Sequence, residues 1–249
     1  MEKINWQGFE WLPSERWGQV HPGNPIAWHN PEMIKLQDDG SVKLGAGICP
    51  KKFMITTLDP DGVEEVEVPV GIGLMSCTYQ FEYGRFEIEA KLPHGQPYAW
   101  PAFWMWAWDS WPPEIDVFEA YTNRKGSYMN WNWDMILGRF FRVATNVHLG
   151  ESPENYNMGA KKHFFGFKDP SKHFMKYAVE WEPDHITIYY NYRVVRKITD
   201  ESVLSQFRGK KMNVIINNGI QKEYIETGEM ATHYMHVKSF SYHQSYYIR

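Results

Sequence analysis

Three carboxylates lie within six residues of a strand-like segment, Glu114-Ile-Asp116-Val-Phe-Glu119. In a regular strand successive side chains point to opposite faces, so Glu114 and Asp116 would share one face and Glu119 would take the other. A β-bulge adds one residue and resets this alternation, which would bring Glu119 to the face of the other two acids. The residues between the acids are apolar. The segment therefore predicts a bulged strand with one buried face and a row of three acids on the other.

Acids in such a row are costly unless one of them holds a proton. The arrangement suits glycoside hydrolysis with retention, in which two carboxyl groups about 5–5.5 Å apart act as nucleophile and as acid/base. The plain alternative is a solvated acidic strand edge. The apolar residues within the motif argue against that alternative, because they indicate that the strand is buried on its other side.

Apolar and charged residues also alternate between Tyr83 and Leu92. The apolar row predicts a strand face in the core, and the charged row is most simply a solvated face. The first thirty residues predict an irregular lead-in with short edge strands. Further strand-like patterns bounded by turn residues occur at 33–47 (a hairpin), 63–70, 71–80, 128–135, 141–148, 174–181, 186–195, 212–217 and 233–242.

One helix is predicted at Thr199 to Arg208, with Thr199 as N-cap, acids in the first turn and Gly209 as the stop. Residues 150–169 are polar and predict a long loop. No internal repeat, low-complexity tract or linker divides the 249 residues. We therefore predict a single domain over residues 1–249, a length at which one large core is feasible.

Tryptophan occupies the even-numbered positions from Trp100 to Trp108, except for Ala102. In an extended strand the even-numbered residues share one face, while Pro101, Phe103, Met105 and Ala107 form a core-like opposite face. Indole rings combine a large apolar area with a polar edge, which suits the surface of a pyranose. Aromatic residues make up 16% of the chain, 12 of them Trp, and favour a sugar-stacking surface. Interior packing is the alternative for Trp106 and Trp108.

Composition excludes several classes of function. The net charge is −4 and no long block of Lys or Arg occurs, so no nucleic-acid partner is predicted. No apolar run approaches the ~18–20 residues of a membrane span. Cys49 and Cys77 are too few for a disulfide framework. They could form one bridge, but free buried thiols are expected. Neither has a neighbouring Cys or His at metal-ligand spacing, so no metal site is predicted.

The motif E-x-D-x-x-E, together with the segments Trp100-Pro-Ala-Phe-Trp-Met-Trp106 and Tyr83-Gly-Arg-Phe-Glu87, resembles glycoside hydrolase family 16. It looks like the bulged branch of laminarinases, agarases, porphyranases and carrageenases, whereas the lichenase branch has one residue fewer before the last Glu. The resemblance covers about residues 73–182. It implies an all-β fold, a jelly-roll sandwich of two antiparallel sheets with a concave sugar-binding cleft.

The resemblance also implies roles for the acids: Glu114 as nucleophile, Glu119 as acid/base, and Asp116 as the helper between them. Family residues that match Trp100 and Trp104 help to form sugar subsites beside the nucleophile. A Trp shortly before the acid motif does likewise in the family, and Trp111 is the candidate here.

The strand expected at 141–148 adds further candidates for substrate binding. Arg142, Asn146 and His148 would share one face and could hydrogen-bond substrate hydroxyls. The resemblance supports His148, because this strand of the family often carries a cleft-facing His; the alternative is a structural His. Arg142 would either pair with a carboxylate of the site or recognise a sulfate or uronate on the substrate.

Two departures from the family pattern lead to further expectations. Many members carry an Asp near the start of the last strand that helps to bind a structural calcium. The matching position here is Val237, so no cofactor is predicted. The family commonly turns the hairpin at 186–195 with Asp-Gly, whereas this chain has Asn191-Tyr192, so a longer or differently built turn is expected.

The expected function is that of a monomeric, endo-acting, retaining β-glycoside hydrolase on a polysaccharide. Candidate substrates are β-1,3- or mixed-linkage glucans and algal galactans such as agarose, porphyran and carrageenan. A non-catalytic sugar-binding jelly roll and a transglycosylase with the same acids are the alternatives. Such an activity implies a secreted or periplasmic protein, although residues Met1 to Trp6 have no apolar signal core.

Overall fold

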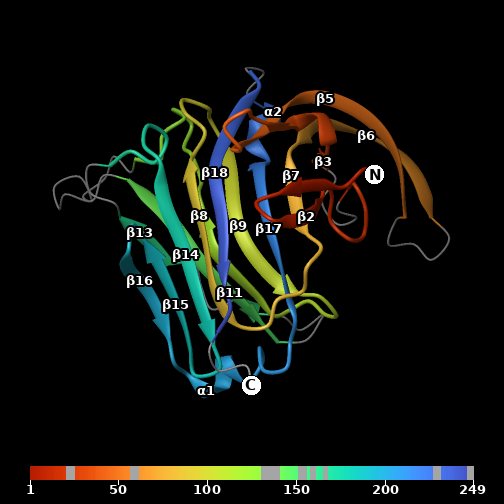
Figure 1. Cartoon of the computed structure of the whole chain (residues 1–249). Coiled ribbons are helices and arrows are strands. Elements are labelled where there is room, and N and C mark those ends of the chain that lie inside the picture. Colours follow the sequence, from red (N-terminus) through yellow and green to blue (C-terminus); the bar gives the residue numbers. More distant parts are fainter. Residues whose placement is uncertain are drawn as a thin grey trace.

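The computed structural model describes residues 1–20, 26–56, 62–129, 141–150, 156–157, 161–164, 168–226 and 231–245. In these ranges strands dominate and form two sheets that lie against each other (Figure 1). Among the described strands one pairing is parallel, between residues 27–29 and 70–72, and the other pairs are antiparallel. The predicted all-β sandwich of two antiparallel sheets is therefore confirmed.

The acid motif belongs to the first sheet, which we call the acid-bearing sheet. In spatial order its strands are β1 (Ile4–Trp6), β2 (Phe9–Leu12), β7 (Leu74–Cys77), β17 (Met212–Ile220), β9 (Ala99–Ala107), β10 (Glu114–Glu119), β11 (Arg142–Leu149) and β12 (Tyr156–Asn157), and β13 (Lys161–Phe164) pairs with β11. The expected short edge strands of the lead-in are thus β1 and β2 on this sheet.

The second sheet, called the opposite sheet, covers the other side of the core. In spatial order it contains β16 (Arg193–Ile198), β15 (His185–Tyr190), β14 (Met175–Glu182), β8 (Gly84–Lys91), β18 (His233–His243), β5 (Val42–Thr56), β6 (Val63–Ile72) and β3 (Ala27–His29), and β4 (Ile34–Leu36) pairs with β5. The β5–β6 hairpin extends beyond the body of the sandwich (Figure 1).

Helices are short: η1 (Pro31–Met33), α1 (Glu201–Leu204) and α2 (Glu223–Glu226). Across the described ranges, none of them has the length and apolar character required to span a bilayer. The helix predicted at 199–208 is only partly confirmed. Its N-cap is Asp200, whose side chain accepts a hydrogen bond from the Ser202 N–H at 2.9 Å, and the α-helix ends at Leu204 before a series of turns.

The core lies between the two sheets, and alternation fixes which side chains enter it. On β8 Phe86, Ile88 and Ala90 are fully buried, whereas Glu87 faces outward and binds Lys176 of β14 at 2.8 Å. On β9 the odd-numbered Phe103, Met105 and Ala107 enter the same core. Both face assignments made from the sequence are confirmed.

Several local expectations are corrected. Asn191 and Tyr192 have φ of 46° and 66° and form a two-residue turn between Tyr190 and Arg193, so the expected longer turn is wrong. Asn tolerates the left-handed region, which permits this tight hairpin. Within the loop expected at 150–169, β12 and β13 pair with β11. Tyr128 lies outside any strand, and residues 130–135 of the strand expected there lie outside the described residues.

The cysteine and Val237 expectations concern positions in or near the core. Cys77 is buried, Cys49 is half-buried, and both are free. Val237 is fully buried on β18, where it is paired with Val42 and Ala90 of the neighbouring strands. An apolar side chain in the core cannot offer a ligand to calcium.

The bulge predicted in β10 is present. Toward β11, Asp116 is opposite Asn146 and Glu119 is opposite Ala144, so β10 contains one residue more than its partner. Toward β9 the register shifts between Asp116 and Phe118. Val117 has no counterpart in either register. The extra residue brings the three acids to one face, while the apolar residues between them join the core.

The backbone carbonyl of Val117 is bound from the opposite sheet. The Tyr190 hydroxyl at the end of β15 donates a hydrogen bond to this carbonyl at 2.7 Å, and it lies 3.3 Å from the carbonyl of Ala144. Both residues that flank this contact, Val117 and Tyr190, are buried. A buried carbonyl without a partner is costly, so Tyr190 compensates for the ladder bond that the bulge interrupts.

Replacing this tyrosine should therefore weaken the fold. Tyr190→Phe should lower the free energy of unfolding by roughly 1–3 kcal/mol, because the Val117 carbonyl stays buried and loses its donor. Tyr128→Phe is the matched control, since the Tyr128 hydroxyl is also buried but has no hydrogen-bond partner among the described residues. Urea unfolding of both variants measures the difference. Equal losses would contradict the supporting role of Tyr190.

Candidate active site

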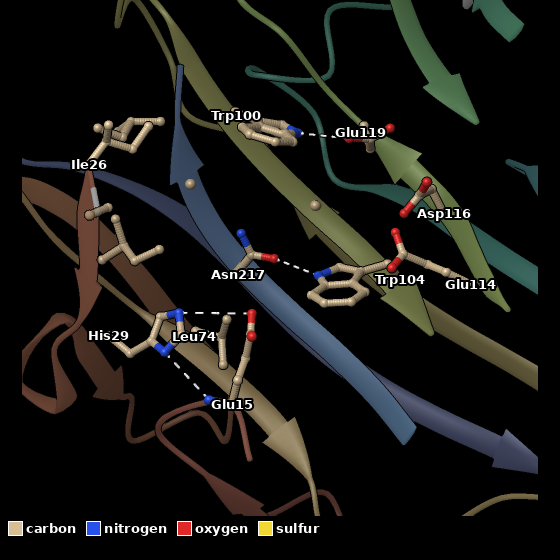
Figure 2. A pocket seen from close by; sticks show the side chains of 15 residues that line it. Glu15, Ile26, His29, Leu74, Trp100, Trp104, Glu114, Asp116, Glu119 and Asn217 are labelled. Carbon is tan, nitrogen blue, oxygen red and sulfur yellow. Dashed lines mark hydrogen bonds and ion pairs between the residues drawn. The ribbon is translucent and has the colours of Figure 1, made fainter. Parts of the chain in front are cut away.

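A pocket of about 310 Å³ opens on the face of the acid-bearing sheet that carries the acids. Glu114, Asp116 and Glu119 line one side of it, and Glu15 and His29 line the other (Figure 2). The floor between these sides consists of Trp100, Trp104 and Asn217, which come from β9 and β17. The pocket therefore combines one acidic wall, an aromatic floor and a second wall built from the N-terminal segment.

Glu114 begins β10 and is largely enclosed. The indole N–H of Trp111 donates a hydrogen bond to its Oε2 at 2.7 Å, and His148 Nε2 lies 3.6 Å from its Oε1. Burial, followed by the negative charge of Asp116, raises the pKa of Glu114 well above its ordinary value, while the Trp111 hydrogen bond opposes this increase. Trp111 itself is 38% exposed, so the indole forms the rim of the site beside Glu114.

Asp116 lies between the other two acids and is buried. Its Oδ2 is 3.3 Å from His148 Nε2. This contact with Asp116 is the main cause that raises the pKa of His148, and burial opposes it. The imidazole is therefore biased toward its cationic form at the centre of the three acids, where a positive charge is stabilising.

Glu119 follows the bulge and accepts two hydrogen bonds on Oε1. Tyr121 donates its hydroxyl at 2.6 Å and Trp100 donates its indole N–H at 3.1 Å. Burial and then the charge of Asp116 raise the pKa of Glu119 to about 7, against the two donors. The Trp100 and Tyr121 rings stack with centroids 5.3 Å apart. A carboxyl group with this pKa can hold or release a proton near neutrality.

Tyr121 was not identified from the sequence. It lies two positions after Glu119, so ordinary strand alternation beyond the bulge gives both side chains the same facing. That spacing was a usable signal. Asn217 was also missed; its Oδ1 accepts a hydrogen bond from the Trp104 indole at 2.8 Å. Its contact with β9 depends on the pairing of two strands more than a hundred residues apart, which no local pattern encodes.

The candidates on β11 occupy different surroundings. Asn146 is buried; its Oδ1 accepts the Val147 N–H at 2.9 Å and its Nδ2 lies 3.2 Å from His148 Nε2. It thus contacts His148 and does not line the main pocket. Arg142 lines a smaller neighbouring pocket together with Glu119 and Tyr121. Among the described residues no ion pair of Arg142 is found.

Only part of the tryptophan row faces the pocket. Trp100 and Trp104 line it and are partly exposed, as expected. Trp106 is 2% exposed, because two residues of the N-terminal segment cover it. The Trp17 and Trp106 ring centroids are 4.6 Å apart, and the Arg16 guanidinium carbon lies 4.2 Å from the Trp106 ring centroid. Interior packing, the alternative given for Trp106, is therefore what the structure has. Trp108 lies beyond the end of β9 and is partly buried.

One group of side chains has the spacing of a metal site. It consists of Glu114, Asp116 and His148, and one potential ligand atom from each lies within 4.8 Å of the other two. Two carboxylates and an imidazole could hold a divalent cation. The same three residues make the close acid–imidazole contacts described above, and catalysis by paired carboxylates needs no metal. We therefore retain the prediction that the site works without one.

The comparisons with known proteins support the family that the sequence resembles. The profile described as "Glycosyl hydrolases family 16" matches residues 57–236. The endo-1,3-1,4-beta-glycanase EglC of Rhizobium meliloti strain 1021 is 29% identical over 110 residues, which is 44% of this chain and 19% of that protein. The beta-glucanase of Rhodothermus marinus is 30% identical over 140 residues, 52% of this chain and 39% of that protein. The aligned regions thus span less than two thirds of either relative.

A solved structure shows the same fold. It is the family 16 protein of the mixed linkage glucan PUL of Bacteroides ovatus, in complex with its G4G4G3G product. It superposes with a TM-score of 0.66 at 18% identity, covering 90% of this chain and 92% of that one. Together with the profile match over most of the sequence, this likeness gives one conclusion: the chain belongs to glycosyl hydrolases family 16.

Proposed function

We propose that the protein is an endo-acting, retaining β-glycoside hydrolase that cleaves a polysaccharide by double displacement. The observation that carries this proposal is the bulge in β10, which gives Glu114, Asp116 and Glu119 a common facing toward the pocket. Two carboxyl groups with separate hydrogen-bond environments on one face are the requirement for a nucleophile and an acid/base. The glycanase and glucanase relatives support the same reaction class.

In the first step Glu114 attacks the anomeric carbon while Glu119 gives its proton to the leaving glycosidic oxygen. Attack requires that Glu114 be ionised, although burial raises its pKa. The Trp111 N–H and the nearby His148 favour the charged form of Glu114. Asp116 would share a proton with Glu114 and keep that proton on its own carboxyl group as Glu114 bonds to the anomeric carbon and the bond to the leaving oxygen breaks. Glu119, with a pKa of about 7, supplies the acid.

In the second step water replaces Glu114 at the anomeric carbon. The ester at Glu114 carries no charge, so the pKa of Glu119 falls and its carboxylate can accept a proton from the attacking water. The bond between the carbon and Glu114 then breaks and both acids return to their starting states. Two inversions at one carbon retain the β configuration. An acceptor sugar in place of water would give transglycosylation, which product analysis distinguishes.

For the substrate we propose a β-1,3- or mixed-linkage glucan. One named relative is an endo-1,3-1,4-beta-glycanase and the other is a beta-glucanase. The described lining of the main pocket contains no Lys or Arg, the side chains that sulfate groups on carrageenan or porphyran favour. A polymeric glucan outside the cell implies a secreted or periplasmic enzyme. All of the proposed catalytic groups come from one chain, so we propose a monomer.

Replacing the nucleophile should abolish turnover. Glu114→Gln keeps the shape of the side chain but removes its ability to attack, so the rate on glucan should fall by several orders of magnitude with an unchanged melting temperature. Glu89→Gln, on the outer face of the opposite sheet, is the control that should retain activity. A Glu114→Gln enzyme with even a tenth of the normal rate would refute the assignment.

The roles of the two glutamates can be separated with azide. Glu119→Ala should still form the glycosyl-enzyme from a substrate whose leaving group needs no proton, and should then stall for want of a base. Azide needs no base, so it should restore turnover and give the β-glycosyl azide. Glu114→Ala should instead give the α-azide through one direct displacement. Proton NMR identifies the anomers; the same anomer from both variants, or rescue of neither, would contradict this division.

The dependence of rate on pH should follow Glu119. As an acid with a pKa of about 7 it must be protonated, so kcat/KM should decline as pH rises through that value. The Tyr121 hydroxyl stabilises the ionised form, and Tyr121→Phe should therefore raise the pKa and move the alkaline limb to higher pH. Tyr192→Phe, at an exposed turn, should leave the profile unchanged. A limb that stays in place or moves to lower pH in Tyr121→Phe would show that Glu119 is not the titrating acid.

A further inference from the structure

We propose that Glu15 is a substrate-binding residue at the far end of the pocket, where it recognises an uncharged sugar unit by hydrogen bonds to the hydroxyl groups of that unit. This inference rests on the proposed function and extends it, because it assigns a specificity-determining contact to the N-terminal segment. Sequence patterns gave no indication of this residue. It emerges from the way in which the segment before β3 folds against the acid-bearing sheet.

Glu15 lies on the side of the pocket away from the acids. Figure 2 shows Glu15 and His29 across the pocket from Glu114, with Asn217 and Trp104 between them. In the sheet, β9 and β17 separate β10 from β7, whose Leu74 also lines the pocket near Glu15. Adjacent strands are ~4.8 Å apart, so these three spacings amount to about 14 Å. A sugar at Glu15 is therefore a different unit from the one that is cleaved.

The carboxyl group of Glu15 has unused hydrogen-bonding capacity. The side chain is buried, with Glu15 only 8% exposed, yet it lines the pocket. Its Oε2 is buried and has no hydrogen-bond partner among the described residues. Its Oε1 lies 3.9 Å from His29 Nε2, beyond hydrogen-bond distance. Buried polar atoms are normally satisfied, so a ligand hydroxyl in the pocket is a natural partner for this group.

The backbone around Glu15 is held in place before any ligand arrives. His29 Nδ1 lies 3.4 Å from the Glu15 N–H and 3.1 Å from the carbonyl of Gly18. The Gly18 N–H donates to the Glu15 carbonyl at 3.1 Å, and the His29 N–H donates to the Gln19 carbonyl at 2.7 Å. His29 itself belongs to β3, which pairs with β6. A preorganised group binds its ligand with little ordering cost.

The charges around this end of the pocket favour a neutral sugar. Burial raises the pKa of Glu15 to about 8, and the positive charge of Arg16 opposes this only in part. At neutral pH the group is mainly a carboxylic acid, which offers both a donor and an acceptor to a sugar. Apart from His29, the ionisable residues of the described lining are all acids. A sulfate or uronate at this position would face acids on both walls, with no Lys or Arg among the described lining residues.

The test compares neutral gluco-oligosaccharides of increasing length. Binding is measured by calorimetry in the inactive Glu114→Gln background. Glu15→Ala should weaken the binding of long chains by about five- to tenfold more than it weakens the binding of the shortest chains. This is the effect expected from the loss of one hydrogen bond. Glu15→Gln keeps a donor and an acceptor in the same shape and should lose less. Glu10→Ala removes an exposed acid of the same segment and serves as the matched control.

The outcomes separate this inference from the proposed function. If the unmodified enzyme cleaves glucan but Glu15→Ala behaves like Glu10→Ala at every chain length, the Glu15 contact is wrong and the function stands. If the unmodified enzyme neither binds nor cleaves neutral gluco-oligosaccharides, both are overturned. Stronger binding of sulfated carrageenan oligosaccharides than of neutral chains would overturn the assignment of an uncharged unit. Melting temperatures and the isosteric Glu15→Gln variant distinguish a lost contact from a lost fold.

Discussion

One extra residue in β10 decides what both faces of that strand can do. Without the bulge, Glu119 would turn into a core formed by residues such as Ile115 and Phe118, where an unpaired carboxylate is prohibitively costly. With it, the acids gather on the open face and every apolar side chain of the segment stays inside. The acid-bearing face and the packing of the core thus depend on the same bulge. The Tyr190 hydroxyl donates a hydrogen bond to the Val117 carbonyl, which the bulge leaves without a partner in the sheet.

Three carboxyl groups on one face repel one another when they are ionised. The surrounding side chains stabilise each of them with a different set of contacts. Glu114 receives one indole donor, whereas Glu119 receives a phenol and an indole. Asp116 contacts the imidazole of His148, which can carry a positive charge. The three acids therefore have three different sets of partners, although they share one strand and one face. In the proposed mechanism, these different surroundings are what would allow similar carboxyl groups on one strand to act as nucleophile, helper and acid.

The sequence was sufficient where a feature is local. Period-two patterns predicted most of the strands, the core face of β9 and a bulge within the acid motif, and the acid motif predicted the family. It failed where distant segments meet. Trp106 belongs to the predicted ladder, but Arg16 and Trp17 cover it. The pocket wall that contains Glu15 likewise requires the N-terminal segment to fold against a strand about sixty residues later in the chain. The tight turn at Asn191-Tyr192 was missed for another reason, because its backbone angles are more often adopted by a pair such as Asp-Gly.

The bond between Tyr190 and Val117 joins residues 73 positions apart and crosses from one sheet to the other. A chain emerging from the ribosome completes β9, β10 and β11 well before β15 exists. The acid face can therefore pair early, but the carbonyl at its bulge has no tyrosine to bind until the opposite sheet has closed over it. Long-range closure of this kind is slow relative to local pairing. The bulge in β10 therefore gains its buried donor only once the opposite sheet is in place, so the acid-bearing face depends on a strand that comes later in the chain.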